Sequence, residues 1–81
     1  MKFLELLNRL DNELSSGVAG QYWHIELYGD ASGDLFEPVD DGEPALTSFN
    51  DINHLENILE ALLEHKPRTS TERVSLILDI E

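Results

Sequence analysis

The spacing of apolar residues changes three times along the chain, and these changes limit the folds that the chain can adopt. Near the start, apolar residues recur at steps of three and four, which is the spacing of one face of a helix. They are Phe3, Leu6, Leu7, Leu10 and Leu14. This pattern predicts a helix over residues 2–15, with Gly17 available as the cap at its C-terminal end.

The period becomes two from residue 21 onward, which is typical of a half-buried strand. One face of this strand carries Trp23, Ile25 and Leu27, and we expect Trp23 to lie in the core. The segment GDASGD then predicts a turn, because glycine, aspartate and serine support turn conformations. Residues 35–39 and 45–49 predict a second and a third strand, separated by the turn DDGEP. Pro38 indicates an edge strand or a bulge, since proline donates no backbone hydrogen bond.

Helical spacing returns in SFNDINHLENILEALLEH, which predicts a second helix that Pro67 ends. Its apolar face comprises Ile52, Leu55, Ile58, Leu59, Leu62 and Leu63. Ser48, with Asp51 three residues later, matches a capping box, and Asn50 is the alternative N-cap. In residues 74–80, apolar side chains alternate again and predict a fourth strand, interior to a sheet or covered at an interface.

The resulting order is helix, strand, strand, strand, helix, strand, which predicts a small two-layer α+β sandwich with a mainly antiparallel sheet. With 81 residues, the chain has room for one domain, residues 1–81, with one small core. The absence of cysteine excludes a disulfide framework and a thiolate metal site. The start MKFLELLNRL lacks the pattern of a signal peptide, and no apolar run reaches the roughly 20 residues needed to cross a bilayer. We therefore expect a cytoplasmic protein.

Acidic residues dominate the charge of the chain, with 17 Asp and Glu against 5 Lys and Arg and a formal net charge of -12. No lysine or arginine lies between Leu10 and His65. Such a surface repels nucleic acid and anionic membranes, which bind cationic side chains. It attracts basic protein surfaces and speeds their approach. We therefore expect a basic protein as the partner, and neither nucleic acid nor a membrane.

A first candidate contact surface lies on the second helix. Glu56, Glu60 and Glu64 follow one another at four-residue steps, so they share one helix face, which we call the acidic ridge. Carboxylates at this spacing imitate the repeating charge of a nucleic-acid backbone. The same pattern is also consistent with a solvated helix face.

A second candidate surface lies on the first strand and the turn that follows it. On the strand face opposite Trp23, aromatic and acidic residues alternate, and the turn adds two more carboxylates. These residues are Tyr22, Glu26, Tyr28, Asp30 and Asp34. Aromatic rings and carboxylates together suit an arginine-rich protein surface, because they offer stacking, cation–π attraction and paired hydrogen bonds.

Metal-binding and catalytic motifs are incomplete in this chain. Asp30, Ser32 and Asp34 match the start of a calcium loop, but Leu35 replaces its glycine, Asp41 replaces its final glutamate, and the flanking segments are predicted strands. The three histidines lack the spacing of a metal site. The chain has no nucleophile elbow G-x-S-x-G and no phosphate-binding loop G-x-x-x-x-G-K-[ST]. We therefore expect no metal ion, no cofactor and no enzymatic activity.

In size, acidity and expected α+β character, the chain resembles the phage-encoded inhibitors of bacterial defence nucleases, including anti-CRISPR proteins, and the immunity proteins that neutralise nuclease toxins. The resemblance implies an inhibitor that acts as a DNA mimic and occupies a basic, nucleic-acid-binding surface of its partner. Two alternatives remain open. The chain is a general interaction or adaptor domain, in one version a homodimer joined through residues 74–80, or it is a small bacterial protein whose acidity serves solubility or adaptation to salt.

Overall fold

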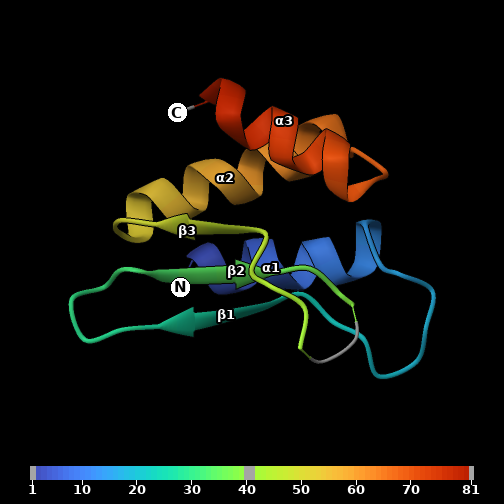
Figure 1. Ribbon diagram of the computed structural model, residues 1–81, viewed down its shortest axis with the longest axis horizontal. Coiled ribbons are helices and arrows are strands. Elements are labelled where there is room, and N and C mark those ends of the chain that lie inside the picture. The colour runs from blue at the N-terminus through green and yellow to red at the C-terminus, as the bar shows by residue number, and fades with distance from the viewer. Residues whose placement is uncertain (1, 40–41, 81) are drawn as a thin grey trace.

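The computed structural model of the protein describes residues 2–39 and 42–80 and shows a small α+β domain (Figure 1). The predicted fold class is confirmed, with one change in the order of the elements. Within the described residues, the elements are α1 (Lys2–Glu13), β1 (His24–Leu27), β2 (Gly33–Phe36), β3 (Thr47–Phe49), α2 (Ile52–His65) and α3 (Ser70–Ile80). The three strands are shorter than the sequence predicted, and α1 ends two residues earlier.

The strands form an antiparallel meander with β2 in the centre. Ile25 pairs with Leu35, which is fully buried, so both side chains belong to the face that packs on the helices. The neighbouring row of paired residues lies on the opposite face, because successive strand residues point to opposite sides. We call this opposite side the outer face. It carries His24, Glu26, Asp34, Phe36 and Ser48.

One hydrophobic core, among the described residues, joins the inner face of the sheet to the helices. Figure 1 shows α1 behind the strands, α2 beside β3, and α3 packed on α2. Half of the large, fully buried side chains come from α2, whose apolar stripe repeats at helical spacing. Full burial of a leucine or isoleucine contributes about 1.5–3 kcal/mol, so α2 supplies a large part of the hydrophobic stabilisation.

Trp23 anchors the segment between α1 and β1 in the core, as the sequence predicted. Its side chain is only 2% exposed. The indole Nε1 donates a hydrogen bond to the carbonyl of Leu14 at 3.0 Å, and its backbone N donates to Oδ1 of Asp11 at 2.8 Å. These two bonds satisfy the polar atoms of a buried residue and hold the start of β1 against the C-terminal end of α1.

The last predicted strand is wrong, because residues 74–80 belong to α3. Alternation suggested a strand, but this segment also fits a helix, because Ile77 and Ile80 follow Arg73 at steps of four and three, the spacing of a helix face. Ile77 is 3% exposed and is the side chain of α3 that packs in the core. A sequence in which both periods coexist does not by itself decide between strand and helix.

The capping residues at the start of α3 are the sequence signal that distinguishes a helix from a strand here. The side chain of Thr69 accepts a hydrogen bond from the backbone N of Glu72 at 3.1 Å. The carboxylate of Glu72 accepts one from the backbone N of Arg68 at 2.9 Å. A threonine followed three residues later by a glutamate is the sequence pattern of a helix start, because the two side chains satisfy backbone donors that a helix leaves unpaired.

The N-cap of α2 also differs from the prediction. Asp51 is the N-cap, and its carboxylate accepts a hydrogen bond from the backbone N of His54 at 2.8 Å. Neither Ser48 nor Asn50 takes this position, and Ser48 lies in β3 instead. At the other end, Lys66 caps the helix in a left-handed conformation with φ 46°, and the proline after it prevents continuation.

Gly33 lies where the backbone of β1 and a core side chain meet. A Cβ atom at this position would lie 2.1 Å from the carbonyl O of Glu26 and 2.7 Å from the ring of Phe49. Both distances are far below van der Waals contact. The glycine therefore allows Phe49, which is 2% exposed, to pack directly over β2.

Candidate binding surface

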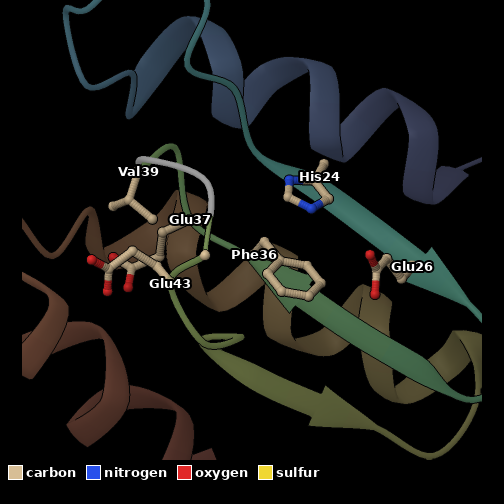
Figure 2. Close-up of a pocket in the computed structure, with 7 residues that line it drawn as sticks. His24, Glu26, Phe36, Glu37, Val39 and Glu43 are labelled. Atoms are coloured by element: carbon tan, nitrogen blue, oxygen red, sulfur yellow. The ribbon is translucent and has the colours of Figure 1, made fainter.

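The outer face of the sheet lies on the side away from α1 and α2, as Figure 2 shows for His24, Glu26 and Phe36. Strand alternation places these side chains there, because the core residues take the other positions of the same strands. Glu26 and Asp34 pair across β1 and β2, so two of the predicted contact residues are direct neighbours on this face. Glu26 is exposed and Asp34 is half-buried.

Asp34 accepts two side-chain hydrogen bonds on the outer face. The hydroxyl of Ser48 donates to Oδ1 at 2.6 Å, and the hydroxyl of Tyr28 donates to Oδ2. These bonds, with that of Ser48 first, hold the pKa of Asp34 below its usual value because they stabilise the carboxylate. The hydrogen bond to Asp34 in turn raises the pKa of Tyr28. Asp34 is therefore a fixed negative charge at neutral pH.

Asp30 organises the turn between β1 and β2. Its Oδ1 accepts hydrogen bonds from the Ser32 hydroxyl and, at 3.1 Å, from the backbone N of Ser32, and these bonds lower the pKa of Asp30. The backbone N of Tyr28 donates to the carbonyl of Ser32 at 2.8 Å, which confirms the predicted reversal. Asp41, the last place of the calcium pattern, lies outside the described residues. Within the described ranges, no three His, Asp or Glu residues are grouped to hold a metal ion.

A pocket of about 190 Å³ opens on the outer face near the C-terminal end of β2 (Figure 2). The rings of His24 and Phe36 stack in it, with centroids 4.4 Å apart and 3° between their planes. Glu26 lies on one side of this pair, and Glu43 and Val39 lie on the other (Figure 2). The pocket therefore combines an aromatic surface with carboxylates at both ends.

Glu37 closes one side of the pocket and holds α3 in place at the same time. Its Oε2 lies 2.5 Å from Nη1 of Arg73 and accepts a hydrogen bond from the hydroxyl of Ser70 at 2.9 Å. The guanidinium of Arg73 also lies 5.3 Å from the centroid of the Trp23 ring. The charge of Glu37 is therefore neutralised within the fold, and Glu26 and Glu43 remain as the carboxylates that the pocket presents.

The lysine and arginine residues lie on the helices or in the segment between α2 and α3, and none of them lies on the outer face of the sheet. Within the described part of the chain, the ion pairs are Lys2–Glu60, Arg9–Glu13, Lys66–Glu13 and Arg73–Glu37. None of them involves a carboxylate of the outer face or of the turn at Asp30. The ion pairs of the described residues therefore lie on the helices and at Glu37, and none of them neutralises a carboxylate of the outer face.

The acidic ridge on α2 is partly neutralised. Glu60 lies 2.7 Å from the ammonium of Lys2, and its hydrogen bond and charge raise the pKa of Lys2. Glu56 adds a smaller effect on the same lysine and is half-buried, whereas Glu64 is exposed. The structure thus places the ridge beside a cation that the sequence pattern did not associate with it.

Other contact residues were predicted in part or missed. Tyr22 is exposed in the segment before β1. The stacking of His24 on Phe36 was missed, although it follows from the hairpin register, in which the two residues pair. Glu43 was missed because nothing in the local pattern shows how the segment after β2 returns to the outer face.

The chain has no match among protein-family models, curated protein sequences or solved structures. In the described residues, no helix has the length and apolar character needed to span a lipid bilayer.

Proposed function

We propose that the protein is a non-enzymatic inhibitor that binds a basic, nucleic-acid-binding surface of a partner protein. The contact is the outer face of the sheet with the turn at Asp30. One observation carries this proposal, the separation of charge between the helices and the sheet. Four cations of the described residues pair with Glu13, Glu37 and Glu60, whereas Glu26 and Asp34 form no ion pair with a described residue.

The chemistry of the outer face supports this assignment. A surface that binds phosphates presents cations at spaced positions, and carboxylates that are already ionised meet such cations without a deprotonation cost. The lowered pKa values of Asp30 and Asp34 keep both side chains charged. Uncompensated charges also accelerate the encounter with a cationic partner, an effect that salt screens. The resemblance in size, acidity and α+β character to nuclease inhibitors agrees with this role.

A displacement assay tests the proposal. A fluorescently labelled DNA duplex is bound to each member of a panel of purified basic nucleases and DNA-binding proteins, and the protein is added at low and at moderate salt. We expect release of DNA from at least one member, with weaker release as salt rises. Polyglutamate serves as the control for charge alone, and the protein should act at a lower concentration of carboxylate groups. Release that never exceeds that caused by polyglutamate contradicts the proposal.

Self-association is a second candidate, favoured by the exposed apolar side chains of α3. Val74 and Leu78 are 42% and 65% exposed and lie four residues apart on one helix face. Because residues 74–80 form a helix, a homodimer would pair through this face and not through a strand edge. Sedimentation velocity of the protein and of Leu78→Ser tests this candidate. A dimer that Leu78→Ser dissociates supports it, and a monomer at every concentration contradicts it.

A further inference from the structure

The pocket on the outer face offers two kinds of contact to a cation. The stacked rings of His24 and Phe36 provide an aromatic surface, and the carboxylates of Glu26 and Glu43 lie at opposite ends of it (Figure 2). With a volume of about 190 Å³, the pocket is smaller than the roughly 300–1,000 Å³ of typical ligand sites. Its size suits one side chain of a partner protein.

The fold already contains one guanidinium held in this way. Arg73 lies over the ring of Trp23 and pairs with Glu37. This internal arrangement removes Glu37 as an acceptor for a ligand, although Glu37 also lines the pocket. Glu26 and Glu43 form no ion pair within the described residues, so an incoming cation finds them without competition.

The geometry points to one arginine side chain of the basic partner as the occupant of this pocket, an assignment that rests on the proposed function. Arginine fits better than lysine for two reasons. Its planar guanidinium stacks on aromatic rings, and its five N–H donors reach acceptors in more than one direction. An ammonium group is compact and strongly hydrated, so it gains little from a ring surface. The pocket would then make the interaction with the basic partner specific, whereas attraction between opposite charges alone does not select one partner.

Nuclear magnetic resonance with small probes tests the assignment on the whole chain. N-acetyl-L-arginine amide is titrated into the ¹⁵N-labelled protein, and N-acetyl-L-lysine amide is titrated at the same ionic strength. We expect saturable shifts of the backbone amides of His24, Glu26 and Phe36 with the arginine probe. The lysine probe should bind at least about fivefold more weakly, because it lacks the stacking contact.

Variants with matched charge separate the pocket from general attraction. Glu26→Gln with Glu43→Gln should weaken binding of the arginine probe, whereas Glu56→Gln with Glu64→Gln should leave it nearly unchanged. Phe36→Leu keeps an apolar side chain and should abolish the preference for arginine over lysine. Circular dichroism checks that each variant is folded, and Phe36→Met takes the place of Phe36→Leu if that variant unfolds.

Three results would overturn the assignment of the pocket: equal binding of both probes, shifts spread over all acidic surfaces, or equal losses in the two Gln pairs. If any of these occurs while the protein still displaces DNA from a basic protein, the proposed function stands without the pocket. If the arginine probe binds locally while no panel member releases DNA, the pocket stands and the proposed function fails.

Discussion

Arg73 and Glu37 join α3 to the segment that follows β2, with Nη1 2.5 Å from Oε2 and the two side chains only 13% and 10% exposed. The contact connects residues that are far apart in the chain and lies next to both the core and the pocket. Arg73 covers the Trp23 ring, and Glu37 lines the pocket. The same ion pair therefore holds the last helix in place and fixes one wall of the candidate site.

Loss of Glu37 should destabilise the protein strongly. Glu37→Ala leaves the charge of Arg73 mostly covered and without its carboxylate, which we expect to lower the free energy of unfolding by about 3 kcal/mol. Glu43→Ala removes an exposed carboxylate that forms no ion pair with the described residues, and should change stability by less than about 0.5 kcal/mol. Urea unfolding measures both variants. Equal losses in the free energy of unfolding would show that the ion pair between Arg73 and Glu37 does not stabilise the protein.

A methyl group at Gly33 should be poorly tolerated. In Gly33→Ala the new Cβ collides with the carbonyl of Glu26 and the ring of Phe49, so β1, β2 or the core must shift. We expect a loss of at least about 2 kcal/mol in the free energy of unfolding. Gly29→Ala is the matched control, because a Cβ there meets no atom within 4 Å. Thermal unfolding of both variants gives the comparison, and similar midpoints would contradict the close approach at Gly33.

The pKa of Asp34 should depend on its neighbour in β3. Ser48→Ala removes the hydrogen bond that contributes most to the lowered pKa, so the pKa of Asp34 should rise toward its usual value. Because the pKa is lowered in the folded state, the stability it contributes is present above the unfolded-state pKa and is lost as pH falls through the folded-state pKa. The stability difference between wild type and Ser48→Ala should therefore be present at neutral pH and shrink below about pH 4.

Carboxyl ¹³C titration and urea unfolding at two pH values measure these effects. Tyr28→Phe should shift the pKa of Asp34 in the same direction by less, since its hydrogen bond ranks second among the causes. Ser75→Ala, an exposed change on α3, should leave the titration of Asp34 unaltered. An unchanged pKa in Ser48→Ala would mean that the bond between β2 and β3 does not persist in solution.

Hydrophobic period was sufficient to predict the parts of the fold in which only one period is present. The stripes of α1 and α2 have no competing alternation, and alternation around Trp23 correctly assigned its side chain to the core. Residues 74–80 satisfy both periods, and there the prediction was wrong. The capping pair Thr69 and Glu72 decides for a helix, because it stabilises a helix start whatever the spacing of the apolar residues that follow.

The candidate site was predictable only as far as local alternation extends. Alternation placed Glu26 and Tyr28 on one face of the first strand, and the turn brought Asp34 next to them. The pairing of His24 with Phe36 needed the hairpin register, which a turn composition does not fix. The ion pair of Glu37 depends on how α3 packs on the rest of the fold, which local sequence does not encode.

Charge reversal on the outer face should weaken binding to a basic partner more than reversal on α2. Glu26→Lys with Glu43→Lys removes carboxylates that no cation of the described residues neutralises, whereas Glu56→Lys with Glu60→Lys acts on a surface that already includes Lys2. Both pairs change the net charge equally, so long-range attraction should fall by a similar amount. In the DNA displacement assay, we expect the outer-face pair to lose at least about tenfold in affinity, or 1.4 kcal/mol, and the α2 pair to lose less. Circular dichroism confirms that both variants are folded. A larger loss in the α2 pair would make the acidic ridge the contact surface and leave the outer face as solvated sheet.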